Sequence, residues 1–205
     1  MVLRVPDDRD APASPVAPDP LASLSDAARR GKSEAMRTLV SSVAPGVLRA
    51  VRGVLGGRHP EVEDVAQEAL LGFVRALGDF RRECSVLHFA CRIAVLSALA
   101  AQRRQHTRAE DHVDAEILDL HEDEQASPAE RAIEARRRAA LRELCAELPD
   151  PQREALVMHI VLGMTVEETA AACRVPINTV RSRLRLAKEA LRAHIEADVR
   201  LREAL

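Results

Sequence analysis

The stretch that decides the fold runs over residues 165–188 and reads TVEETAAACRVPINTVRSRLRLAK. Thr165 is a good helix N-cap, and Glu168 three residues later completes a capping box, in which each side chain bonds the other residue's backbone. The short helix after this cap should end near Cys173, and Pro176 should open a second helix after a brief turn. Two short helices joined by a turn of about three or four residues form a helix-turn-helix.

The second of these two helices is amphipathic and basic. Val175, Val180 and Leu184 should face inward, with the small Ala170 where the helices cross. Polar and basic side chains remain on the outward face near its start: Asn178, Thr179, Arg181, Ser182, Arg183 and Arg185. Arg neutralises phosphates and can bind guanine with two hydrogen bonds, and Asn can read adenine. This face is typical of a helix that enters the DNA major groove, and the alternative is a solvated amphipathic helix.

Charge is unevenly distributed along the 205 residues, although the formal net charge is only −2. Residues 21–104 carry 13 basic and 8 acidic side chains, and residues 173–192 carry six basic side chains and one acidic. Between them, residues 105–130 carry one basic and nine acidic side chains. This acidic stretch has few apolar residues and no sustained period, so it predicts a flexible linker between two domains.

Helical periodicity extends through both blocks beside the linker. Apolar residues recur at helical spacing over 33–55, from about 61 to 77, and from about 84 to 104. After the linker, helices are expected over about 128–147, over 152–162 with Asp150 as N-cap, and from Pro176 to about 200. The chain is 47% hydrophobic but only 1% aromatic, which favours helix over strand.

The predicted fold class is therefore all-α, with two small helical domains joined by an acidic flexible linker. We expect a disordered tail over 1–25, a helical domain over 26–104, the linker over 105–127 and the helix-turn-helix domain over 128–205. No apolar run approaches the ~20 residues that span a bilayer, and the N-terminus lacks the apolar core of a signal peptide. The sequence thus predicts a cytoplasmic protein without a cofactor.

Three residues at helical spacing, Cys84, His88 and Cys91, could lie on one helix face and offer soft ligands to zinc. Cysteines on an apolar stripe are more often plain core residues, and the sequence alone leaves both readings open. No glycine-rich phosphate loop or HExxH motif is present, so the sequence predicts no enzymatic activity and no catalytic residues.

The two helical blocks resemble regions 2 and 4 of bacterial sigma factors of the sigma-70 family, extracytoplasmic-function (ECF) group. The residues that resemble region 2 are Asp64-Val65-Ala66-Gln67-Glu68, Arg75-Ala76-Leu77, Phe80-Arg81 and Arg92-Ile93-Ala94. The residues that resemble region 4 are Leu148-Pro149, Gln152-Arg153, Gly163-Met164-Thr165, Glu167-Glu168, Ala170, Val175-Pro176, Thr179-Val180-Arg181-Ser182-Arg183-Leu184 and Ala187. The likeness covers about 30–104 and 130–195.

The resemblance implies a function and partners. A protein of this group binds core RNA polymerase through the β′ coiled coil and the β flap, recognises promoter DNA at the −10 and −35 elements, and is commonly inhibited by an anti-sigma factor. Carried over by position, the core-binding residues are Asp64, Gln67 and Glu68. The −10 residues are Phe80, Arg81, Arg82, His88, Phe89 and Arg92. The −35 residues are Asn178, Thr179, Arg181, Ser182, Arg183 and Arg185.

Two other functions remain alternatives. A helix-turn-helix transcriptional regulator that does not engage polymerase would explain the C-terminal block, but it has no need of the polar segment 64–68. A helical interaction protein without a DNA role would leave the basic helix unexplained.

Members of the group commonly carry Gly in the turn of the DNA-binding motif where this chain has Arg174. A left-handed conformation there would cost about 1 kcal/mol.

Overall fold

The computed structural model describes residues 19–57, 59–108 and 144–197, and within these ranges no residue lies in a strand. The predicted all-α class is confirmed. The helices in chain order are α1 (Ala22–Arg29), α2 (Ser33–Leu55), α3 (Val62–Ala76), the 3-10 turn η1 (Leu77–Asp79), α4 (Val86–Arg108), α6 (Asp150–Leu156), the π-helical turn η2 (Val157–Val161), α7 (Val166–Cys173) and α8 (Ile177–Ala197).

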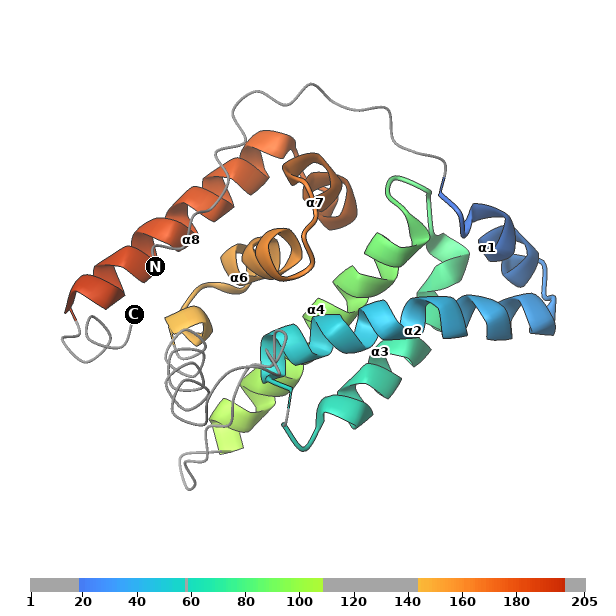
Figure 1. The fold of residues 1–205 in the computed structure, drawn as a ribbon, viewed down its shortest axis with the longest axis horizontal. Coiled ribbons are helices and arrows are strands. Elements are labelled where there is room, and N and C mark those ends of the chain that lie inside the picture. Colours follow the sequence, from blue (N-terminus) through green and yellow to red (C-terminus); the bar gives the residue numbers. More distant parts are fainter. Residues whose placement is uncertain (1–18, 58, 109–143, 198–205) are drawn as a thin grey trace, which may run out of the picture.

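Helices α1–α4 form an N-terminal unit around α2 and α4, which pack against each other and against α3 (Figure 1). Its core consists mostly of aliphatic side chains together with the three phenylalanine rings, and Leu39, Val43, Phe73 and Leu99 are each at most 1% exposed. The apolar periodicity of the sequence places these residues on inward faces, so burial of this stripe stabilises the helices.

The sequence predicts the bounds of α2 closely, and Pro45 lies inside it without ending it. Helix α2 ends where Gly56 takes up φ 101°, a backbone conformation that residues with a Cβ avoid.

Helix α1 was not predicted, and the expected tail over 1–25 is too long at its C-terminal end. The Asp19 carboxylate accepts a hydrogen bond from the backbone N–H of Val86, the first residue of α4, at 2.8 Å. Arg29, at the end of α1, donates to the carbonyl oxygens of Gly78 and Phe80 at 2.9 and 3.3 Å. These hydrogen bonds join residues about 50 to 67 positions apart, so no local sequence pattern predicts them.

The C-terminal unit contains α6, η2, α7 and α8. The sequence predicts the bounds of α7 and the start of α8 correctly, and the expected helix 152–162 is divided between α6 and the wide turn η2. The prediction of Asp150 as the N-cap of this helix is wrong, because Pro149 occupies the N-cap position. The Asp150 carboxylate instead bonds Arg103 and Arg153. Most of the predicted linker and of the helix over 128–147 lies outside the described residues.

The two units pack together. Val157, Met158, Met164, Ala172 and Cys173 belong to the same buried cluster as the N-terminal core. In Figure 1, α6 and α7 lie beside α2 and α4, and α8 lies on the far side of α6 and α7.

Helices α2 and α4 are long and apolar enough to cross a membrane by length and composition alone, with a mean hydropathy of 1.2. About half of each apolar window (44% and 50%) is buried inside the protein. Each helix also packs against several others, so both are accounted for as core helices of the N-terminal unit.

Candidate nucleic-acid interface

The turn between α7 and α8 has the geometry that the capping pattern predicts. The Glu168 backbone N–H donates to Thr165 Oγ1 at 3.1 Å, and the Thr165 N–H donates to Glu168 Oε2 at 2.8 Å. Arg174 ends α7 in the left-handed conformation, with φ 55° and ψ 45°. The Val175 N–H then bonds the Ala170 carbonyl at 3.1 Å, which closes the turn before α8 begins.

The inner face of α8 holds it against α6 and α7. Val180 is fully buried and Leu184 is 6% exposed, and they form one apolar cluster with Ala155, Val166 and Ala170. The inward positions that the sequence predicts at Val180, Leu184 and Ala170 are therefore confirmed. Packing on this face fixes which side chains of α8 are left on the outside.

Most of the residues expected to contact the −35 element lie on that outer face. Asn178, Arg181, Ser182 and Arg185 are exposed, and Thr179 is half-buried. Arg181 lies 3.8 Å from Glu167 on α7, and Arg185 bonds Glu189 one turn along at 2.8 Å. Exposed pairs of this kind contribute about 0–1 kcal/mol, so they hold the guanidinium groups only weakly.

Arg183 lies elsewhere. Its side chain is 22% exposed and approaches the Glu154 carboxylate of α6 at 3.9 Å. Arg183 therefore faces away from Arg181 and Arg185, because residues two positions apart on a helix are rotated by about 200°.

The residues expected at the −10 element divide into a buried and an exposed set. Phe80 and Phe89 are 5% and 7% exposed, and their rings stack with centroids 4.9 Å apart. Neither ring presents a face to solvent for base stacking in this structure. Arg81 and Arg82 beside them are exposed.

Arg82 takes up a left-handed conformation, with φ 59°, and its guanidinium bonds the Asp26 carboxylate. That hydrogen bond lowers the pKa of Asp26. This contact ties the exposed loop after η1 to α1.

The other two residues expected at the −10 element, His88 and Arg92, lie on α4 facing the C-terminal unit. His88 lines a groove of about 190 Å³ between α2, α4 and the segment 162–164. Arg92 Nε donates to Glu154 Oε1 at 2.9 Å, and its side chain is 24% exposed.

The residues expected to bind core polymerase share one exposed face of α3. Asp64, Gln67 and Glu68 are all exposed, and Glu68 lies 3.6 Å from Arg104 of α4. The sequence spacing therefore places them together, as i, i+3 and i+4 neighbours should be.

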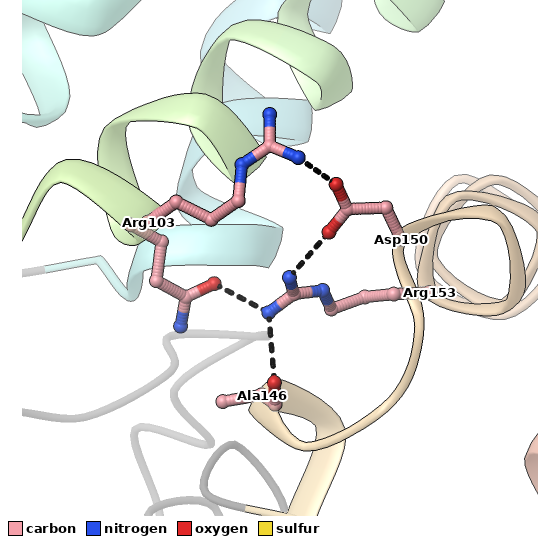
Figure 2. A network of polar contacts seen from close by, with 5 residues as sticks. Arg103, Ala146, Asp150 and Arg153 are labelled. Atoms are coloured by element: carbon pink, nitrogen blue, oxygen red, sulfur yellow. Dashed lines mark hydrogen bonds and ion pairs between the residues drawn. The ribbon is translucent and has the colours of Figure 1, made fainter. Parts of the chain in front are cut away.

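Sequence reasoning missed a polar network that joins the two units, drawn in Figure 2. Arg103 of α4 bonds Asp150 of α6, and Asp150 also accepts from Arg153 at 2.8 Å. Arg153, 6% exposed, donates to Gln102 Oε1 at 3.0 Å and approaches the Ala146 carbonyl at 3.5 Å. Charged residues are exposed by default, so nothing in the local sequence marks Arg153 or Glu154 as buried.

The cysteines behave as apolar residues. Cys91 belongs to the buried core, and Cys84 packs against it. Burial raises the pKa of each thiol to about 11. Within the described parts of the chain, no group of three His, Cys, Asp or Glu side chains could hold a metal ion. The core interpretation of Cys84 and Cys91 is favoured.

Comparisons with known proteins point to one family. The family model "Sigma-70 region 2" matches residues 39–108, and "Sigma-70, region 4" matches residues 138–191. The chain is 33% identical over 172 residues to the ECF RNA polymerase sigma factor SigD of Mycobacterium tuberculosis, covering 82% of this chain and 80% of SigD.

Two solved structures share the fold. One is CnrH in complex with the cytosolic domain of CnrY, 23% identical, with a TM-score of 0.56 over 86% of this chain and 97% of that one. The other is the sigma factor RpoE in complex with the anti-sigma factor NepR from Bartonella quintana, 19% identical, with a TM-score of 0.52 over 79% and 97%. From these matches together, the chain belongs to the ECF group of the sigma-70 family of RNA polymerase sigma factors.

Proposed function

We propose that this chain is a sigma factor that binds core RNA polymerase and directs promoter-specific transcription initiation. The observation that carries this is the outward basic face of α8, set by a complete capping box and turn, in a chain that belongs to the ECF group. The polymerase performs the chemistry and this chain supplies recognition, so it is no enzyme itself. It acts where the polymerase is, in the cytoplasm.

At the −35 element, Arg181 and Arg185 are the discriminating residues and Arg183 contacts phosphate. Arg181 and Arg185 are exposed four residues apart on one face, as base-reading side chains in the major groove must be. Arg183 is turned toward α6 and away from that face, so we expect it to reach the DNA backbone and not the base edges. Asn178, Thr179 and Ser182 flank this face near the start of α8.

At the −10 element, recognition rests on charge more than on stacking. Phe80 and Phe89 support the loop from inside, which leaves Arg81 and Arg82 exposed beside them. His88 and Arg92 come next on α4 and complete the segment. Base stacking on aromatic rings contributes about 1–3 kcal/mol per base, so strand separation here depends on the basic side chains and on polymerase.

The polymerase-binding surface is the exposed face of α3 at Asp64, Gln67 and Glu68. It would contact the β′ coiled coil, while the C-terminal unit contacts the β flap. An anti-sigma factor is the expected inhibitor, because the related RpoE fold was solved with the anti-sigma factor NepR. A helix-turn-helix regulator that ignores polymerase is not favoured, because the chain also carries the sigma-70 region 2 match over 39–108.

The test is to reconstitute the full chain with core polymerase, map transcription start sites on genomic DNA, and then compete promoter variants. Removing a bidentate Arg–guanine contact through Arg181→Ala or Arg185→Ala should cost about 1–3 kcal/mol and relax preference at one base pair. Arg183→Ala should weaken all sequences alike and reduce the salt slope by about 0.9. If Arg183→Ala alone altered sequence preference, our assignment of the base-reading face of α8 would be wrong. If the reconstituted polymerase started no transcription at specific sites, the proposed sigma-factor function would be refuted.

A further inference from the structure

Basic side chains gather where the end of α1 meets the loop after η1, and all of them are exposed. They form what we call the basic corner: Arg29, Arg30, Lys32, Arg81 and Arg82. Residues 26–32 and 77–82, which contain the corner, carry five basic and two acidic side chains. A surface of this charge attracts phosphate, because Lys and Arg displace the cations that surround a nucleic acid.

Hydrogen bonds from two sides hold α1 against this loop. Arg29 donates to the carbonyl oxygens of Gly78 and Phe80 at 2.9 and 3.3 Å. The Arg82 guanidinium in turn bonds the Asp26 carboxylate of α1. The end of α1 and the loop therefore form one continuous surface, although about 50 residues separate them in the sequence.

The positive charge of this corner is only partly balanced by acids. Asp26 is one carboxylate among several guanidinium groups. The hydrogen bond from Arg82 lowers the pKa of this carboxyl, and the charges of Arg30 and Arg29 lower it further. In the part of the chain that the structure describes, no carboxylate lies within ion-pair distance of Arg30 or Lys32. These two side chains therefore present their charge to solvent.

The position of the corner indicates its ligand. Arg81 and Arg82 are expected at the −10 element, and Arg30 lies beside them on the same surface. Gly31 turns the chain with φ 83°, and Lys32 follows directly in this turn. In Figure 1, α1 lies at the end of the molecule opposite α8, so the corner is separate from the −35 face. Basic side chains that flank a reading surface typically bind phosphate, which fixes the position of the DNA.

We propose that the basic corner is a contact with the DNA backbone, in which Arg30 and Lys32 bind phosphates next to the −10 element. The proposal rests on the proposed function, because that function assigns Arg81 and Arg82 of the same corner to the −10 element. It adds the end of α1 and the turn after it to the DNA-binding surface. These contacts contribute affinity and position, and they carry no sequence preference.

The experiment combines Arg30→Gln with Lys32→Gln in the full chain. The combination of Arg30→Lys with Lys32→Arg is the matched control that keeps both charges. Arg37→Gln is a second control, because it removes an exposed charge from α2 outside the corner. Each protein is assembled with core RNA polymerase, and circular dichroism of the free chain reports folding. Anisotropy then gives the affinity for a labelled promoter fragment, taken from a mapped transcription start site, at salt concentrations from about 50 to 200 mM.

The neutralised pair should weaken promoter binding and flatten the slope of log affinity against log salt. Each phosphate contact contributes about 0.7 to 0.9 to that slope, so the loss of two should flatten it by about 1.4–1.8. The affinity deficit should then shrink about tenfold over the fourfold rise in salt. Both controls should keep the wild-type slope. Fragments with altered −10 sequences should lose affinity equally, because phosphate is common to all sequences.

A wild-type salt slope in the folded Arg30→Gln, Lys32→Gln protein would overturn the proposal. Weaker binding of this variant to core polymerase in the absence of DNA would also overturn it, because the corner would then bind polymerase. The single variants, each expected to give about half of the change in slope, keep the test valid if the pair fails to fold. The proposed function is judged on the wild-type chain alone. It stands if that chain directs transcription from specific sites, whatever the variants do; if it does not, the function fails and this proposal falls with it.

Discussion

The left-handed residue at the turn of the DNA-binding motif allows a quantitative test. Arg174 holds φ 55°, a conformation that costs a residue with a Cβ about 1–2 kcal/mol. Glycine avoids that cost but gains about 0.4–1 kcal/mol of conformational freedom in the unfolded chain. Arg174→Gly and Arg174→Ala both lose the Glu83 ion pair, so the pair cancels in their comparison. Arg174→Gly should therefore be the more stable of the two by about 0.8 kcal/mol.

Arg37 provides the matched control, because it is an exposed arginine inside helix α2. There the order should reverse, with Arg37→Ala more stable than Arg37→Gly by about 0.8–1.0 kcal/mol. Urea unfolding measured by far-ultraviolet circular dichroism gives the four free energies. If alanine equals or exceeds glycine at position 174 while the Arg37 pair behaves as expected, the strain argument is wrong.

Three further outcomes are expected. Asp64→Arg combined with Glu68→Arg should abolish co-purification with core polymerase, while Glu34→Arg should not; retention by the folded double variant would contradict the core-binding assignment. Thr165→Ala removes the capping-box acceptor and should lower the free energy of unfolding by about 1 kcal/mol, whereas Thr165→Ser should preserve most of it in thermal melts. Burial raises the pKa of Cys91 from 9.0 to about 11, so its thiolate population at pH 8 should be about a hundredfold lower folded than unfolded, and labelling by a thiol reagent should be correspondingly slow. Because the folded pKa is the higher one, this thiol contributes stability that is lost as pH rises from about 9 through 11.

Local chemistry made the helix-turn-helix predictable. The capping pair Thr165 and Glu168 lies within one helical turn, and the inward stripe of Val180 and Leu184 follows from their spacing along one helix. The structure reproduces all of these because no distant residue competes with them.

The features that sequence reasoning missed depend on distant partners. Asp150 has the sequence of a helix N-cap, yet Arg103, 47 positions away, takes its carboxylate. Glu154 looks like an ordinary exposed acid until folding brings Arg92, 62 positions away, against it. The pattern of one helix cannot tell which other helix will cover it, and here that choice decides which charges are buried.

The π-helical turn η2 has a consequence for how homologous sequences align. The N–H of Leu162 bonds the carbonyl of Val157 five residues back, so this turn holds one residue more than an α-helical turn would. Deleting one residue from Val157–Val161 would restore an ordinary α-helix and rotate the chain beyond it by about 100°. The side chain of Val161 would then no longer pack against Gly53 of α2. A one-residue gap at this point in a relative would therefore mark a protein whose two halves meet differently.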